Sequence, residues 1–102
     1  MDQLQVIAEP RRREILALVW DNEMAAGDIA ARFEVSFGAV SQHLKVLREA
    51  GFVQLRRDGN RRYYRADKDR LGPFREILES TWRDTLDHLA ATIEHDEDEG
   101  RE

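Results

Sequence analysis

Apolar residues along this chain recur with two different periods, one typical of helices and one typical of strands. Steps of three and four residues predict short helices over Gln3 to Ala8, Pro10 to Trp20 and Gly27 to Phe33. The same spacing predicts a helix from Ser36 to Ala50 and a long one from Leu71 to Ile93. Polar and apolar residues alternate only between these last two helices. The chain is therefore predicted to be mainly α, with five helices and one small β-hairpin.

The segment from residue 36 to residue 66 contains the strongest local signals. Ser36 is a favoured N-cap residue, because its hydroxyl can accept a hydrogen bond from an unpaired backbone N–H of the first turn. Gly51 is expected to end this helix. Alternation predicts one strand over Phe52 to Arg57 and another over Arg61 to Ala66, joined by a turn at Asp58-Gly59-Asn60. The helix is thus followed by a two-stranded wing.

A three-residue connection, Glu34-Val35-Ser36, joins this helix to the preceding one, and such spacing is typical of a helix-turn-helix unit. With the hairpin added, the predicted fold is a winged helix-turn-helix. Tyr63 and Tyr64 point to opposite faces of the second strand, since successive side chains alternate in a strand. One of them is expected to be buried, and the alternation does not decide which.

Charge is distributed unevenly along the chain. The net charge is −5, but residues 36–66 contain seven arginine and lysine side chains against two acidic ones, a local balance of +5. The segments before and after this window sum to −3 and −7. A basic centre is the expected electrostatic signature of nucleic-acid binding, and acidic flanks would orient the molecule on a polyanion. The flanks are equally consistent with ordinary solvated helix faces.

A helix that packs through Val40, Leu44 and Leu47 turns its opposite side outward. Gln42 on that side could pair bidentately with adenine, and Phe37 could contact a thymine methyl group. The hairpin arginines could straddle the DNA backbone or enter a minor groove. The candidate DNA-binding residues are Ser36, Phe37, Gly38, Ser41, Gln42, His43, Lys45, Arg48, Arg56, Arg57, Asn60, Arg61 and Arg62.

The stretch from Ile7 to Ala66 resembles a winged helix-turn-helix repressor of the ArsR family. The resemblance rests on AEPRRREIL, AAGDIAARFEVS, VSQHLKVLREAGFV and DGNRRYYRA, which are similar to the family's second helix, first reading element, recognition helix with its turn, and wing. It implies an obligate homodimer, built from the first and last helices, that represses transcription at an operator and often at its own promoter. It also implies that Ser36, Ser41, Gln42 and His43 lie at or near DNA.

Three features differ from the family pattern. Ala25 stands where relatives usually carry a serine or threonine cap, and loss of that hydroxyl would weaken the helix start by about 1 kcal/mol. Phe37-Gly38 replaces a polar residue and a proline or alanine often found there. The chain has no cysteine, which excludes the Cys-x-Cys site of soft-metal sensors as well as disulfides and thiol redox switches.

The predicted last helix carries an apolar stripe that a small winged domain is not expected to cover. A second copy would bury it in a two-fold interface, the alternative being a monomer whose last helix folds back as core. Two recognition helices would then lie roughly 34 Å apart, so the operator would be an imperfect palindrome. The predicted interface residues are Leu4, Ile7, Phe74, Leu78, Trp82, Leu86, Leu89 and Ile93.

The domain is expected to span residues 1–94, followed by an acidic, disordered tail over residues 95–102. His88 and His95 are seven residues apart, which differs from the histidine spacing of the metal-sensing relatives. Although Asp84, Asp87 and Glu94 are near them, His88 is interpreted as an exposed or interface-edge residue and His95 as part of the tail. We therefore predict no metal ligands and no cofactor.

Several functional classes find no support in the sequence. It has no cysteine nucleophile, no glycine-rich phosphate loop and no serine in an elbow motif, so an enzyme is not expected. No apolar run approaches the ~20 residues of a membrane helix, and the N-terminus lacks a signal-peptide pattern, so a cytoplasmic protein is expected. Two alternatives to a repressor stay open: an adaptor for a protein partner, and a sensor of a small molecule or metal at a dimer interface. The identity of any effector, and activation in place of repression, stay open as well.

Overall fold

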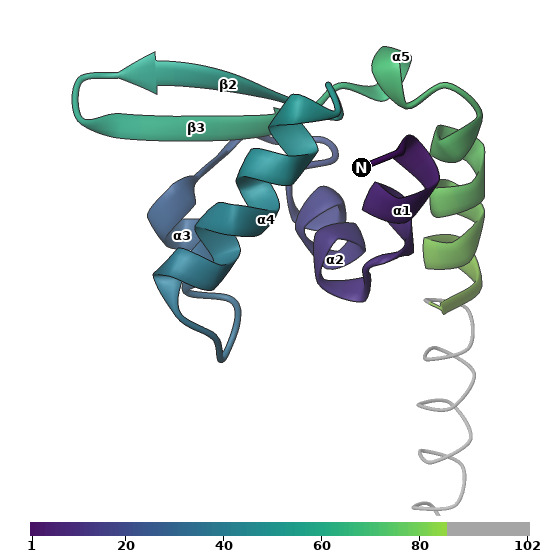
Figure 1. The fold of residues 1–102 in the computed structure, drawn as a ribbon, viewed down its shortest axis with the longest axis horizontal. Helices are drawn as coiled ribbons and strands as arrows, with labels where there is room; N and C mark the ends of the chain where they lie inside the picture. Colours follow the sequence, from purple (N-terminus) through teal and green to yellow (C-terminus); the bar gives the residue numbers. More distant parts are fainter. Residues whose placement is uncertain (86–102) are drawn as a thin grey trace, which may run out of the picture. The chain divides into compact units, whose positions relative to one another are not determined.

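The computed structural model describes residues 1–85, which separate into one compact unit up to Gly72 and another that begins at Pro73. The elements of the first unit are α1 (Gln3–Ala8), α2 (Pro10–Leu18), β1 (Met24–Ala25), α3 (Ala26–Ala30), α4 (Phe37–Glu49), β2 (Val53–Asp58), β3 (Arg61–Ala66) and α5 (Lys68–Leu71) (Figure 1). In the second unit, residues 73–85 are helical. The mainly helical class is confirmed.

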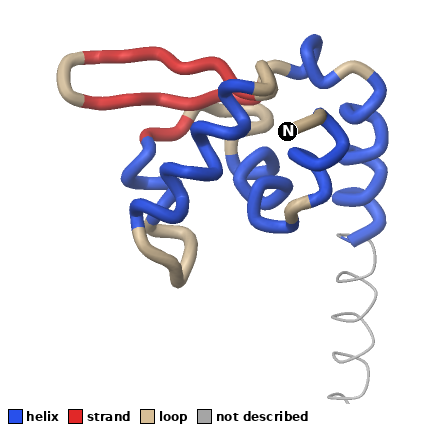
Figure 2. Tube along the Cα trace, viewed as in Figure 1, coloured by secondary structure: helices blue, strands red, loops and turns tan. Residues whose placement is uncertain are grey.

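The strands form one antiparallel sheet in the order β1-β3-β2, drawn in red in Figure 2. The prediction of a two-stranded β element was therefore incomplete. Met24 and Ala25 pair with Tyr64 and Tyr63 on the far edge of β3. A strand of two residues is too short to show an alternating pattern, so no signal in the sequence marked it.

The hairpin turn is one residue shorter than predicted. Asp58 pairs with Arg61, which leaves only Gly59 and Asn60 between the strands. Gly59 has a φ of +61°, and among the described residues no residue other than glycine has a positive φ. A positive φ at the first loop position alone is the arrangement of a type II′ turn, whose twist matches that of the flanking strands.

The core of the first unit forms where α4 packs against α2, α3 and β2. As predicted, α4 buries Val40, Leu44 and Leu47. Tyr64 is buried and Tyr63 is only half-buried, which decides the choice that the alternation left open. Other fully buried side chains of this unit are Val6, Ile15, Leu16, Val19, Ile29, Phe52 and Leu71.

Both predicted ends of α4 are confirmed. The Ser36 hydroxyl accepts a hydrogen bond from the Ala39 N–H at 3.1 Å. At the other end Gly51 adopts a φ of +80°, and the Phe52 N–H donates to the Leu47 carbonyl at 2.9 Å. The Gly51 N–H donates to the Arg48 carbonyl at 2.9 Å, which completes a Schellman motif.

Helix boundaries elsewhere differ from the predicted ones. Helices α2 and α3 end at Leu18 and Ala30, because the apolar residues that extended the pattern, Trp20 and Phe33, lie in the turns that follow. Leu71 belongs to α5, an extra helical turn that ends at Gly72, whose φ is +55°. The predicted last helix therefore begins after Gly72, and its residues 86–93 lie outside the described part of the chain, as does the predicted tail over residues 95–102.

None of the helices within residues 1–85 is long and apolar enough to cross a membrane.

Candidate nucleic-acid interface

The predicted reading face of α4 is exposed. Ser41, Gln42, Lys45 and Arg48 all lie on the solvent side of the helix, opposite its buried stripe. Phe37, in the first turn, is 57% exposed although it is a large aromatic residue. The helix therefore presents two polar groups, two cations and one apolar ring on a surface whose position is fixed by core packing.

Two hollows bring this face together with the wing. Ser41, Gln42 and Lys45 line one of them beside Arg62 of β3. Phe37 and Ser41 line the other, together with Asn60 and Arg62 at the hairpin and the first residues of α3. Ser41 and Arg62 belong to both hollows, so the predicted helix and wing residues form one continuous surface.

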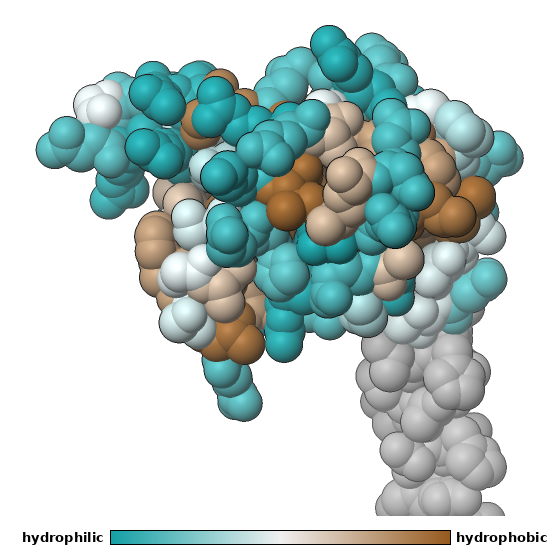
Figure 3. Space-filling view, in the orientation of Figure 1, coloured by the Kyte–Doolittle hydropathy of each residue, from teal (hydrophilic) through white to brown (hydrophobic). Residues whose placement is uncertain are grey.

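The two faces of the hairpin carry different residues. Leu55 lies opposite Tyr64 and Arg57 opposite Arg62, and these pairs share the face that borders the α4 hollow. Arg56 lies opposite Tyr63 on the other face. Hydrophilic side chains cover the hairpin in Figure 3, whereas apolar side chains are visible over α3 and the start of α4.

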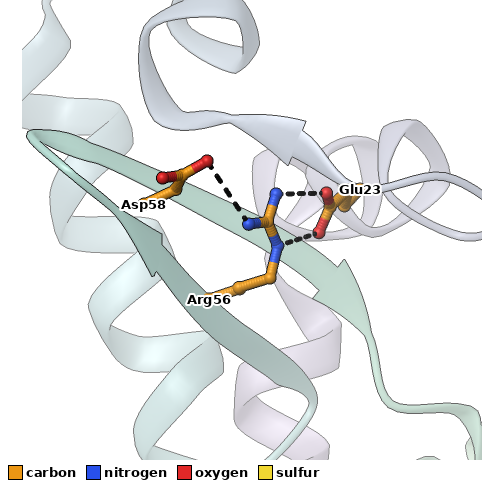
Figure 4. A network of polar contacts seen from close by, with 3 residues as sticks. All are labelled: Glu23, Arg56 and Asp58. Carbon is orange, nitrogen blue, oxygen red and sulfur yellow. Dashed lines mark hydrogen bonds and ion pairs between the residues drawn. The ribbon is translucent and has the colours of Figure 1, made fainter.

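Arg56 is held by neighbours within the protein. Its guanidinium donates to both carboxylate oxygens of Glu23, from Nη2 at 2.6 Å and from Nε at 3.0 Å (Figure 4). Nη1 lies 3.8 Å from Asp58, and the guanidinium carbon lies 4.5 Å from the centre of the Tyr63 ring. The hydrogen bond from Arg56 lowers the pKa of Glu23, and in return it raises the pKa of Arg56. Among residues 1–85, Arg57, Arg61 and Arg62 form no ion pair.

His43 is half-buried, unlike the other candidate residues on α4. Its Nδ1 lies 3.5 Å from Nη1 of Arg12 on α2. Arg12 is itself buried and donates to the carbonyls of Val6 at 2.8 Å and Gln5 at 3.1 Å. Arg12 was not predicted as part of this region, because an arginine in a run of three on a polar helix face gives no sign of burial.

Gly38 has room for a side chain within the protein. A Cβ at this position would lie 3.9 Å from the Ser36 hydroxyl oxygen, which is an ordinary van der Waals distance. Glycine in a helix costs roughly 0.5–1 kcal/mol relative to alanine. The fold therefore does not require this glycine, and its small size is available for close approach of a partner.

The predicted dimer-interface residues fall into four groups. Leu4 is 65% exposed, whereas Ile7 and Leu78 are buried and Phe74 and Trp82 are half-buried. Leu86, Leu89 and Ile93 lie outside the described residues. Ile77, which the predicted interface did not include, is 58% exposed.

No group of three or more histidine or acidic side chains within residues 1–85 is arranged to hold a metal ion. His88 and His95 lie outside this part of the chain.

Comparisons with known proteins agree with this geometry. The profile of the bacterial regulatory protein, ArsR family, matches residues 9–54, from the end of α1 into β2. A crystal structure described as a possible transcriptional regulator for arsenical resistance is 47% identical, with a TM-score of 0.69 over 90% of this chain and 96% of that one. The chain belongs to the ArsR family. It is thus a winged-helix, DNA-binding transcriptional regulator, and its family consists of regulators and not of enzymes.

Two further relatives are informative about assembly and activity. The transcriptional repressor SdpR of Bacillus subtilis is 40% identical over 60 residues, which cover 59% of this chain and 67% of SdpR. A solution structure from Mycobacterium bovis is a homodimeric winged helix-turn-helix DNA-binding domain of a possible ArsR-family regulator. It is 28% identical, with a TM-score of 0.67 over 82% of this chain and 78% of that one. The Mycobacterium bovis domain shares the fold found here.

Proposed function

We propose that this regulator is a cytoplasmic homodimeric repressor that binds a palindromic operator, including one in its own promoter. The observation that carries this proposal is the continuous surface formed by the exposed face of α4 and the arginines of the wing. The repressor activity of SdpR supports the direction of regulation. A protein bound across a promoter excludes RNA polymerase, so occupancy alone would repress.

Within this surface, α4 reads bases and the wing holds phosphates. Gln42 pairs with adenine in the major groove, Ser41 accepts either base or phosphate, and Phe37 rests against a thymine methyl group. Lys45 and Arg48 flank these residues and bind backbone phosphates. Ser36 caps the helix that presents them, and Gly38 lets the backbone approach the duplex.

Arg57 and Arg62 support the assignment of the wing. They lie directly opposite one another in the hairpin, and like charges in such a pair destabilise a sheet. Both side chains are exposed, and neither has an acidic ion-pair partner among the described residues. Phosphate groups would supply the missing anions, so this repulsion is relieved in the complex. Arg61 and Asn60 at the tip extend the same contact along the backbone.

His43 and Arg56 act from within the protein in this scheme. His43 packs against Arg12 behind the reading face, and Arg56 is paired with Glu23. Each therefore supports a DNA-contacting element from its protein side.

Dimerisation places two such surfaces on one operator. The homodimeric Mycobacterium bovis domain supports this assembly. Exposed Leu4 and Ile77 and half-buried Phe74 and Trp82 are apolar side chains that a second copy would bury further, whereas Ile7 and Leu78 are already buried within one chain. Leu86, Leu89 and Ile93 would extend this surface along the predicted continuation of the last helix. A two-fold arrangement would present the α4 helices in adjacent major grooves, about 34 Å apart.

The test is a binding titration of the protein against its own upstream DNA and an unrelated fragment of equal length, at two salt concentrations. We expect preference for the upstream fragment and a steep loss of affinity with salt. The double variant R61A/R62A should lose most of the affinity for both fragments. Equal and weak binding of the wild-type protein to both fragments would contradict the proposal for this promoter, and absence of a two-fold footprint would contradict the palindrome.

A further inference from the structure

Glu23, Arg56 and Tyr63 form a contact that crosses the whole sheet, here called the wing brace. Glu23 immediately precedes β1, Arg56 lies in β2, and Tyr63 lies in β3 between them. Ala25, Tyr63 and Arg56 are in register across the three strands. Glu23 lies just before β1, and its hydrogen bonds with Arg56 place its carboxylate on the sheet face that carries Arg56 and Tyr63.

The geometry of the brace is more specific than that of an ordinary surface ion pair. Arg56 donates two hydrogen bonds to the two oxygens of Glu23, at 2.6 and 3.0 Å. The same guanidinium stacks over the Tyr63 ring at 4.5 Å. Exposed ion pairs usually contribute little, but a bidentate arginine held on an aromatic ring has a fixed orientation. The brace therefore joins the two edge strands of the sheet across the middle one.

The position of the brace matters because the wing has few other supports. Beyond Leu55 and Tyr64, residues Arg57 to Arg62 are all exposed. The backbone ladder of the hairpin sets its register. Near its base, the hairpin is tied to the rest of the unit by the pairing of β3 with β1 and by the hydrogen bond from the Ala66 N–H to the Val19 carbonyl. The sheet face that carries the brace is opposite the one that borders the α4 hollow.

We propose that Arg56 and Glu23 are positioning residues, which hold the wing at the angle that brings Arg57 and Arg62 to the DNA backbone. This inference rests on the proposed function, and it separates the wing arginines into two classes. Arg56 is neutralised by Glu23 and makes no phosphate contact, whereas Arg62 has no ion-pair partner within residues 1–85 and binds a phosphate. Sequence alone gives the two residues the same role.

A charge-swap experiment distinguishes the two classes. The variants are R56E, E23R and the double variant E23R/R56E, which re-forms the pair with reversed charges. The matched controls are R62E and E23R/R62E, and both double variants keep the net charge of the wild-type chain. Operator affinity is measured for each variant over a series of salt concentrations, and amide hydrogen exchange of β2 and β3 is measured without DNA.

We expect R56E to weaken operator binding and E23R/R56E to recover to within about threefold of the wild type, since the coupling is specific to the pair. E23R should not recover R62E in the same way. The dependence of log affinity on log salt should keep its wild-type slope in E23R/R56E, whereas R62E should make that slope shallower by about 0.9 for each phosphate that the wing no longer binds. Without DNA, the rate of amide hydrogen exchange in the hairpin should rise in R56E and in E23R. In the double variant E23R/R56E it should return to the wild-type rate.

Two results would overturn the inference. Failure of E23R to restore R56E, together with a reduced salt slope in both, would make Arg56 a phosphate ligand. Equal recovery of operator affinity in both double variants would mean that R56E acts through the net charge of the protein and not through loss of the pair with Glu23. If the wild-type protein prefers no DNA fragment, the proposed function fails, and the exchange measurements still decide whether the brace orders the wing.

Discussion

Helix α4 and the β2–β3 hairpin form the two halves of the candidate interface, but their functional side chains are positioned by different forces. The outward face of α4 is set by what the helix buries, since Val40, Leu44 and Leu47 fix its rotation and Ser36 and Gly51 fix its ends. The hairpin has apolar anchors only at its base. Beyond them, its orientation depends on the polar contact between Glu23 and Arg56.

This difference explains why the two halves should respond differently to substitution. A change in the α4 stripe affects folding first and DNA binding as a consequence. A change in the exposed outer part of the hairpin, from Arg57 to Arg62, leaves the core intact and alters binding first. The reading helix is thus robust to solvent conditions, whereas the wing should be sensitive to charge, salt and pH.

The largest effect is expected when a buried side chain of α4 is truncated. Leu44 is 2% exposed, and its replacement by alanine should lower the free energy of unfolding by about 2–5 kcal/mol through reduced burial and a residual cavity. Denaturant unfolding measures this difference. The control V35A truncates an exposed apolar residue just before the helix and should change stability by less than about 0.5 kcal/mol. A small effect of L44A would mean that α4 is not positioned by packing.

The next effect concerns base reading by the exposed side of the same helix. Q42A should lower affinity for the operator by about 1–3 kcal/mol and leave non-specific DNA binding nearly unchanged, because the substitution removes an interaction with a base. K45A should weaken both kinds of binding in similar proportion, since a phosphate contact carries no sequence information. Competition binding with operator and unrelated DNA gives the ratio of the two affinities directly. A Q42A protein with unchanged preference would place base recognition elsewhere.

The contrast between the two halves also explains how much could be predicted from the sequence. Stretches with a strong period were predicted correctly, including α1, α4 with both caps, and β3. The errors in helix bounds occurred where the apolar spacing continues past the end of the helix. Trp20 is buried although α2 has ended, and Leu71 fits the spacing of the following helix although Gly72 separates the two.

The sequence predicted some features of the candidate site and missed others. Exposure of Ser41, Gln42, Lys45 and Arg48 follows from helical geometry alone, and the structure confirms it. The role of Arg56 could not be inferred in this way, because its partner Glu23 is 33 residues away and follows no motif. The pairing of β1 with β3 brings Glu23 to the sheet, and β1 is itself too short to be predicted from the sequence.

A smaller effect is expected at the start of α4, where the helix cap adjoins the proposed DNA-binding surface. S36A removes the acceptor of the Ala39 N–H and should lower the free energy of unfolding by about 1 kcal/mol. S41A is a matched control on the same helix, because it removes an exposed hydroxyl that caps nothing, and stability should change by less than about 0.5 kcal/mol. Chemical denaturation of the two variants tests the pair. Equal losses would show that the cap contributes no more than an ordinary surface hydroxyl.

The smallest effect should appear in the wing as the pH falls. The hydrogen bond from Arg56 holds the pKa of Glu23 below its ordinary value of 4.5. A carboxyl group with a lowered pKa stabilises the folded state above its unfolded pKa, and this contribution is lost as the pH falls through the folded value. The melting temperature of the wild type should therefore exceed that of E23Q by a constant amount from pH 7 to about pH 5.5, and the gap should narrow below about pH 4.5. In an R56Q background the same Glu23 substitution should lose most of this pH dependence, because the hydrogen bond that lowers the pKa is gone. A gap that narrows equally in both backgrounds would mean that the carboxylate of Glu23 acts without Arg56, and the brace would no longer explain how the wing is held.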